Sequence, residues 1–209
     1  IIYATFHREN EMRLIENANR GKNKIIDSAP FPSTDVEKVS ALLKKCPIAS
    51  ETPLLEIPNF LPQGNLWVKD ERKRMGLGSF KALGAAYVIA SHAQHLTKNP
   101  NSTTLEGKTY VTASAGNHGL SLAAGAKIFG AKAVVFISET VPETFSDRLR
   151  EKGAVPVRKG SDYAASMSAA LEAAEENDWI LLSDSSWENY IDKPLKLMEG
   201  YLQMADEAM

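Results

Sequence analysis

The chain has 209 residues, of which 44% are hydrophobic and 24% charged, and its formal net charge is -2. These values are ordinary for a soluble globular protein of one or two domains, and they give no reason to expect nucleic acid or an acidic membrane as a partner. No apolar run reaches the length of a membrane span, and the single cysteine, Cys46, excludes an internal disulfide and favours a reducing, cytoplasmic location.

The first part of the chain contains one clear helix. Residues 1–32 are rich in polar and charged residues and contain few apolar anchors, so this segment is predicted to be an arm with a short edge strand near its start. Apolar residues at helical spacing then predict a helix over residues 35–45, capped by Ser33 or Thr34 and ended by Pro47.

Strand-like and helix-like segments alternate through the rest of the chain. A strand is predicted at 65–68, followed by a charged loop at 70–74 and a helix that Ser79 caps. Further strands are predicted at 110–113, 133–138, 154–157 and 179–183, and further helices at 118–129, 142–152 and 162–177. This alternation predicts an α/β fold in which a parallel sheet carries flanking helices on both faces.

Ligand sites in such sheets lie beyond the carboxyl ends of the strands. Three loops are predicted to meet at that edge: the loop that leads to Lys81, the loop at 114–118 and the loop at 183–190. Lys81 falls in the first turn of its helix, where the helix dipole disfavours a cation, and residues 82–86 provide no carboxylate to hold an ammonium ion. A neutral amine of this kind suits imine formation with an aldehyde. An ordinary surface lysine explains the same stretch when it is taken alone.

The loop at 114–118 opens a helix, where free backbone amides and the dipole attract anions. A plain strand-to-helix turn is the structural alternative for this loop. Asp184 follows a buried strand and places a carboxylate at the same edge, although a helix cap explains it equally well. The four histidines form no metal-binding pattern, and His92 and His95 are predicted to lie on a solvated helix face.

Two motifs carry a resemblance to a known family. They are Lys-Asp-Glu-x-x-Arg-x-Gly-Leu-x-Ser-Phe-Lys-Ala-Leu-Gly at 69–84 and Ser-x-Gly-Asn-His at 114–118. Together they resemble the fold-type-II pyridoxal-phosphate enzymes of the tryptophan synthase β superfamily, and within it most the diaminopropionate ammonia-lyases. The lyases also carry a motif similar to the Asp-Ser-Ser-Trp-Glu-Asn-Tyr stretch at 184–190.

The resemblance covers roughly residues 34–209 and implies a domain organisation. Residues 1–86 would form the N-terminal part of the large domain, 87–183 the small α/β domain, and 184–209 the return to the large domain. The glycine-rich loop that holds the cofactor phosphate in this family has no counterpart after Gly119. The resemblance places it beyond Met209, so the chain is expected to be incomplete at its C-terminus.

The resemblance also implies the cofactor, pyridoxal 5'-phosphate, and the roles of the site residues. Lys81 would bind the cofactor covalently, Phe80 would pack beside it, and Asn117 would bond the phenolic oxygen of its ring. Asp184 would be the second catalytic residue, a base that faces the substrate. The substrate carboxylate would be held by the loop residues Ser114, Ala115, Gly116 and His118.

The function that the resemblance predicts is elimination of ammonia from 2,3-diaminopropionate to give pyruvate and ammonia. The protein is expected to be a homodimer that acts on a small amino-acid substrate. Ala115 departs from the lyases, which typically carry an aspartate there that is linked with handling the D-isomer. The Ser-Ala-Gly-Asn-His form is that of threonine and serine dehydratases, which is the second interpretation. A third is a non-catalytic α/β binding domain or inactive fragment, because the phosphate loop is missing. Asn189, in place of the usual glycine, is a smaller departure.

Overall fold

The structure is a computed structural model that describes residues 18, 30–60 and 65–209. Residues Pro32–Met209 form one compact unit, which holds every described helix and strand. The predicted edge strand and nearly all of the predicted arm at 1–32 lie outside the described residues. The predicted domain boundaries after residues 86 and 183 stay predictions.

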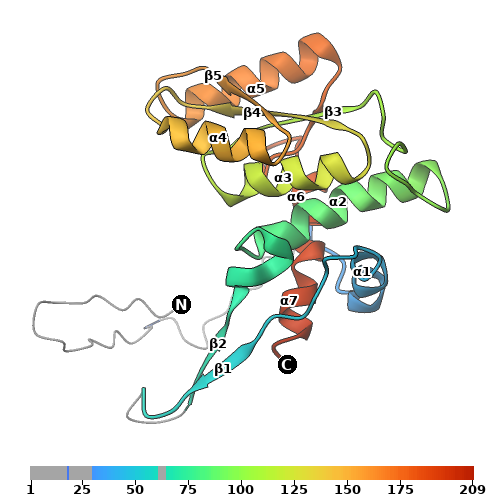
Figure 1. The fold of residues 1–209 in the computed structure, drawn as a ribbon, viewed down its shortest axis with the longest axis vertical. Coiled ribbons are helices and arrows are strands. Elements are labelled where there is room, and N and C mark those ends of the chain that lie inside the picture. Colours follow the sequence, from blue (N-terminus) through green and yellow to red (C-terminus); the bar gives the residue numbers. More distant parts are fainter. Residues whose placement is uncertain (1–17, 19–29, 61–64) are drawn as a thin grey trace, which may run out of the picture. The chain divides into compact units, whose positions relative to one another are not determined.

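Two sheets and eight helical segments make up this unit (Figure 1). The strands are β1 (Leu54–Ile57), β2 (Leu66–Lys69), β3 (Thr109–Ala113), β4 (Lys132–Ile137), β5 (Val155–Arg158) and β6 (Ile180–Leu181). The α-helices are α1 (Val36–Leu43), α2 (Lys81–Leu96), α3 (Asn117–Ile128), α4 (Glu143–Glu151), α5 (Tyr163–Asn177), α6 (Asp192–Gly200) and α7 (Leu202–Asp206). A 3-10 helix, η1 (Glu71–Gly76), precedes α2.

The main sheet is parallel, with the strand order β5-β4-β3-β6. This confirms the predicted parallel sheet. Strands β1 and β2 form a separate antiparallel pair, in which Leu55 lies opposite Val68. The sequence predicted the second of these strands but not its antiparallel partner.

Helices cover both faces of the main sheet, as predicted. Side chains of β4 alternate between the faces: Val134 and Phe136 pack with α5, whereas Val135 and Ile137 pack with residues of α2, α3 and α4. Figure 1 shows α5 on one side of the strands and α3 and α4 on the other. The strands are therefore buried on both faces, which explains the continuous apolar run of β4.

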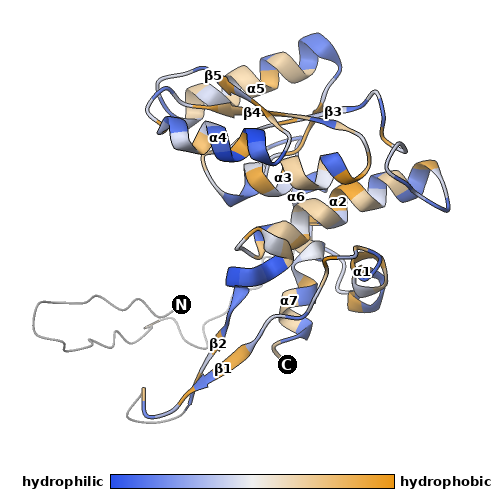
Figure 2. Ribbon diagram, viewed as in Figure 1, coloured by the Kyte–Doolittle hydropathy of each residue, from blue (hydrophilic) through white to orange (hydrophobic). Residues whose placement is uncertain are grey.

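The helices on the second face differ in how much of their surface is buried. Helix α3 is buried along most of its length, from His118 to Ala126. In α4 the buried side chains are Phe145, Ser146 and Leu149, and Figure 2 shows its ribbon mostly in the hydrophilic colour. Helix α3 is thus an internal layer between the sheet and α2, and α4 is an amphipathic surface helix.

The predicted element ends differ from the structure by up to two residues, and two of these differences have a clear physical cause. The Asp35 side chain caps α1 by accepting from the Lys38 amide at 3.0 Å, so the predicted Ser33 or Thr34 cap is wrong. The Ser33 hydroxyl instead accepts from the Asp35 amide at 3.2 Å. The last strand, predicted over 179–183, ends at Leu181: the Leu182 amide still bonds Val111 of β3, but the Leu182 carbonyl accepts from the His118 ring instead of continuing the ladder.

Candidate active site

Lys81 and Asp184 form an ion pair where α2 begins and β6 ends. The Lys81 Nζ lies 2.6 Å from Asp184 Oδ2, and the two side chains are 31% and 22% exposed. The N-cap of α2 is Phe80 and not the predicted Ser79, although the Ser79 hydroxyl accepts from the Lys81 amide at 3.3 Å. The amine therefore lies in a partly open site, with the start of α2 on one side and the Asp184 carboxylate on the other.

The expectation that no carboxylate holds the Lys81 amine is wrong. Residues 82–86 provide no carboxylate, but the fold brings Asp184 from 103 positions away in the sequence. Burial raises the pKa of Asp184, but the charge of a protonated His118 and the hydrogen bond and charge of Lys81 act against it, and the pKa lies below its usual value. Asp184 is therefore a carboxylate at neutral pH and can accept a proton.

The loop after β3 closes on the Ser114 side chain. The Ser114 Oγ accepts from the amides of Gly119 at 3.0 Å and Gly116 at 3.3 Å. A Cβ added to Gly119 would lie 3.2 Å from the Ser114 Cβ, so this turn leaves little room at that position. A Cβ on Gly116 would meet nothing within 4 Å. The start of α3 is thus open beside Gly116 and tightly packed one turn further on.

The residues of this loop differ in exposure. Ala115 and Asn117 are exposed, and Ser114 and Gly116 are partly buried. His118 is 3% exposed, and its Nε2 donates to the Leu182 carbonyl at 2.8 Å. Burial lowers the pKa of His118, so the ring is neutral with its proton on Nε2. Because His118 is enclosed, a substrate can reach the other residues of this loop but not the His118 side chain.

The loop after β6 also closes on itself. Trp187 and Tyr190 pair through their backbones, with N–O distances of 3.0 and 3.3 Å, and their rings stack with centroids 4.3 Å apart. The Tyr190 hydroxyl accepts from the Ser183 amide at 2.9 Å and donates to the Leu181 carbonyl at 3.1 Å. Sequence reasoning assigned no role to Tyr190, although it ends the predicted lyase-like motif.

Phe80 lies between the amine and a second tyrosine. Its ring centroid is 5.9 Å from the Lys81 Nζ and 5.0 Å from the Tyr201 ring, which meets it edge-on. Burial raises the pKa of Tyr201 to about 12, and its hydroxyl has no partner among the described residues. Tyr201 carried no motif signal in the sequence, and only the approach of α6 to α2 places it here.

Two polar predictions away from Lys81 need correction. The charged residues at 70–74 pair with one another but lie mostly in the 3-10 helix η1 and not in a loop, and Arg74 is 1% exposed and also bonds Glu207. His92 does not lie on a solvated face, since its Nδ1 lies 2.6 Å from the hydroxyl of the buried Tyr110. No group of three or more His, Cys, Asp or Glu side chains in the described part is placed to hold a metal ion.

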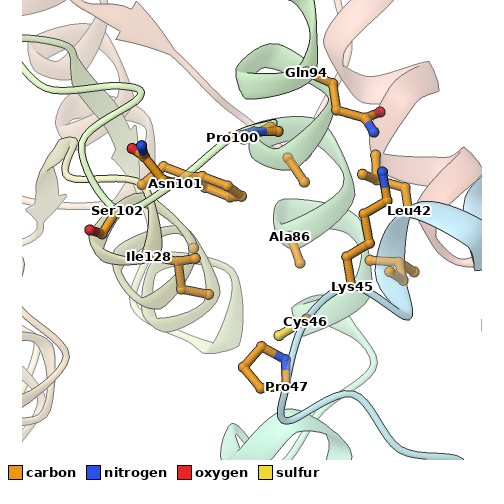
Figure 3. Close-up of a pocket in the computed structure, with 14 residues that line it drawn as sticks. Leu42, Lys45, Cys46, Pro47, Ala86, Gln94, Pro100, Asn101, Ser102 and Ile128 are labelled. Atoms are coloured by element: carbon orange, nitrogen blue, oxygen red, sulfur yellow. The ribbon is translucent and has the colours of Figure 1, made fainter. Parts of the chain in front are cut away.

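A cavity lined mainly by apolar side chains does not contain this chemistry. It has a volume of ≈ 210 Å³ and lies between α1, α2 and α3. Figure 3 shows side chains that surround it, among them Leu42, Cys46, Pro47, Ala86 and Ile128. The residues that line it do not include Lys81 or Asp184. The candidate active site is therefore defined by reactive side chains and not by the cavity.

The residues around the ion pair fit the aldehyde and ring of pyridoxal phosphate. The Lys81 amine is partly exposed, an aromatic ring lies beside it, and Asn117 presents an exposed amide side chain at the start of α3. Backbone amides at helix starts and glycine-rich loops are the usual phosphate ligands. The sequence contains no glycine-rich run after Gly119 to supply such a loop.

The fold and the site define a class: an α/β protein that presents a lysine–aspartate pair beyond the carboxyl end of a parallel strand. Residues 47–209 match the family of pyridoxal-phosphate dependent enzymes. The chain is 31% identical over 187 residues to the diaminopropionate ammonia-lyase of Salmonella typhimurium, which covers 82% of this chain and 46% of that protein. It is also 31% identical over 146 residues to a catabolic L-threonine dehydratase of Staphylococcus aureus, covering 68% and 39%.

Solved structures give the same result. The crystal structure of Escherichia coli diaminopropionate ammonia lyase in complex with D-serine matches with a TM-score of 0.78 at 27% identity, over 86% of this chain and 50% of that chain. The chain therefore belongs to the pyridoxal-phosphate dependent enzyme family, which confirms the fold and the cofactor that the motifs implied. It spans about half the length of the curated relatives it matches.

Proposed function

We propose that the full-length protein is a pyridoxal-phosphate dependent ammonia-lyase that converts 2,3-diaminopropionate to pyruvate and ammonia. The observation that carries the proposal is the ion pair between Lys81 and Asp184 at 2.6 Å, which places an amine and a proton acceptor together at the open edge of the site. The similarity to the Salmonella lyase supports the substrate. We also infer the homodimer and the cytoplasmic location predicted from the sequence.

Each residue has a separate task in this proposal. Bound pyridoxal phosphate supplies the electron sink that stabilises a carbanion next to the amino group. Lys81 provides the amine that bonds the cofactor aldehyde, and Asp184 holds or accepts the proton that the amine or the substrate gives up. Phe80 and Asn117 orient the cofactor ring. Ser114 and the amides beside Gly116 bind the substrate carboxylate at the positive end of α3.

The second candidate is a serine or threonine dehydratase. Ala115 favours it, because this residue is exposed in the loop that would face the substrate and provides no group that transfers a proton. The similarity to the Staphylococcus L-threonine dehydratase is consistent with it. The same observation bears on stereochemistry: with Asp184 as the acid–base residue and alanine at 115, we expect turnover of L-substrates and little turnover of D-substrates.

A substrate panel separates these functions. Full-length protein with pyridoxal phosphate is incubated with L- and D-diaminopropionate, L-serine and L-threonine, and the 2-oxo acid and ammonia are measured. The lyase releases pyruvate and two equivalents of ammonia from L-diaminopropionate faster than it turns over L-serine or L-threonine. Preference for the hydroxy amino acids identifies the dehydratase, and rapid turnover of D-diaminopropionate contradicts the role given to Ala115.

The Lys81→Ala variant tests the central residue. It removes the amine that bonds the cofactor, so we expect roughly a 10³-fold or larger loss of turnover. Borohydride reduction followed by peptide mass spectrometry should find pyridoxyl groups on Lys81 in the unmodified protein and none at that position in the variant. Lys159→Ala is the control, since Lys159 is 60% exposed and pairs with Glu172 at 3.6 Å. Equal turnover by the Lys81 variant would remove Lys81 from the mechanism.

A further inference from the structure

The end of β6 is held by side chains and not by a longer ladder of strand hydrogen bonds. Strand β6 pairs with β3 at Ile180 and Leu181, and the Leu182 amide donates to the Val111 carbonyl at 2.9 Å. After this point the backbone leaves the sheet, and Asp184 follows. A carboxylate on a segment of this kind needs other contacts to keep one position.

Side chains supply those contacts on both sides of the strand end. The Tyr190 hydroxyl bonds the Leu181 carbonyl and the Ser183 amide, and the His118 ring bonds the Leu182 carbonyl. Three consecutive residues before Asp184 are thereby fixed. Burial raises the pKa of Tyr190 to about 12, so its hydroxyl keeps its proton at neutral pH and can donate and accept at the same time.

The tyrosine is itself held in place. Its ring stacks on Trp187 with an interplanar angle of 13°, and the Lys193 Nζ lies 5.5 Å from its centroid. The loop from Asp184 to Tyr190 is thus a closed unit whose last residue bonds the backbone just before its first. A displacement of the tyrosine hydroxyl would therefore displace the backbone at Asp184.

We propose that Tyr190 is a positioning residue that holds the Asp184 carboxylate against the Lys81 amine. This inference rests on the role proposed for Asp184 in the lyase reaction. The Tyr190 hydroxyl bonds the backbone of Leu181 and Ser183 and not the amine or the carboxylate, so it acts through the backbone. Its hydroxyl is therefore the group to remove.

The test compares Tyr190→Phe with a matched control. Tyr190→Phe keeps the ring and its stacking and removes only the hydroxyl. Tyr110→Phe also removes a buried tyrosine hydroxyl that makes a hydrogen bond, here to His92 at 2.6 Å, but the Tyr110 side chain packs on the opposite face of the main sheet from Tyr190. Urea unfolding shows that both variants are folded and measures the stability that each has lost.

The first readout is the reactivity of Lys81, which requires no turnover. Full-length protein without cofactor is labelled with a small amount of acetic anhydride, and acetylation of Lys81 is compared with that of the exposed Lys159 by mass spectrometry. An amine that is hydrogen-bonded to a carboxylate is less available to the reagent, so labelling of Lys81 should rise about two- to fivefold in Tyr190→Phe and in Asp184→Asn. In Tyr110→Phe it should match the unmodified protein.

The second readout is steady-state kinetics of the cofactor-loaded enzyme, in which Tyr190→Phe should lower kcat about tenfold and change KM little. Unchanged labelling of Lys81 in Tyr190→Phe, or an equal rise in Tyr110→Phe, overturns the inference. Full turnover by Asp184→Asn instead contradicts the proposed function of Asp184. The labelling result still decides the role of Tyr190 in that case, so the two failures are distinguishable.

Discussion

Asn189 shows how one position of the loop after β6 departs from the lyase motif without loss of its shape. Its backbone has φ +67°, a left-handed conformation that costs most residues about 1–2 kcal/mol. Glycine adopts it freely, and asparagine is among the residues that tolerate it best. The replacement of the usual glycine by Asn189 therefore preserves the turn that brings Tyr190 back to Leu181.

Ala115 is the residue at which we expect the largest change in specificity. Ala115→Asp adds a proton-transferring group to an exposed position of the loop at the start of α3. We expect turnover of D-diaminopropionate to rise by about 10²-fold, the lower end of what a placed acid–base group contributes. Pyruvate release from the separate D- and L-isomers measures it.

The control for this change is Ala115→Asn, which has the same size and transfers no proton. An equal gain with asparagine, or no gain with aspartate, would show that position 115 does not control stereospecificity.

Helices α2 and α6 approach each other through a pair of glycines. A Cβ on Gly84 would lie 2.6 Å from the Tyr201 ring, and a Cβ on Gly200 would lie 2.7 Å from the Leu83 carbonyl and 2.8 Å from the Gly84 Cα. The backbones therefore meet almost directly. This contact places Tyr201 beside Phe80 and so forms one wall of the site.

Gly200→Ala should destabilise the protein, because the new methyl group meets backbone atoms that cannot rotate away. We expect a loss of about 1–3 kcal/mol in the free energy of unfolding, measured in urea. Gly125→Ala in α3 is the control: its Cβ meets the end of the flexible Ile89 side chain at 2.9 Å, and alanine favours the helix by about 1 kcal/mol. Equal stability of the two variants would contradict close packing at Gly200.

A buried cluster of charges joins distant parts of the compact unit. Arg74 of η1 bonds Glu71 at 2.7 Å, and it bonds Glu207, which lies 133 positions away, at 2.9 Å. Lys69 at the end of β2 pairs with Glu207 at 2.8 Å. The residue after α7 is thereby tied to the segment that leads into Lys81. Breaking such a pair on one side costs roughly 3–5 kcal/mol, because the remaining charge stays buried.

The same cluster predicts a dependence of stability on pH. Burial raises the pKa of Glu207, but the bonds from Arg74 and Lys69 outweigh burial and lower the pKa to about 2, from an ordinary value of 4.5. A depressed pKa stabilises the folded state above the unfolded pKa, and this stability is lost as the pH falls from 4.5 toward 2. Glu207→Gln should therefore cost about 3 kcal/mol at pH 7 and progressively less at pH 4 and pH 3.

Urea unfolding of both proteins at these three pH values provides the measurement. A difference that does not change with pH would mean that the charge of Glu207 contributes nothing to stability.

Residue patterns were sufficient for the main architecture. The apolar run of β4, the glycine after α3 and the Asp162 cap of α5 are local signals, and each element formed where its signal predicted. Local patterns failed where a partner comes from elsewhere in the chain. Nothing near His92 in the sequence indicates the hydroxyl of Tyr110 on β3, so a half-buried histidine was predicted as exposed.

The amino-acid order fixed the family, the parallel sheet and the loops that carry Lys81, Asn117 and Asp184, because periodicity and short motifs act over a few neighbouring residues. Folding in three dimensions settled the partners: the carboxylate on Lys81, the burial of Arg74 and the bond from Tyr190 to the end of β6. These contacts depend on how strands and helices cross. Asp184, 103 positions away in the sequence, becomes a neighbour of Lys81 only because α2 begins beside the edge of the sheet at which β6 ends.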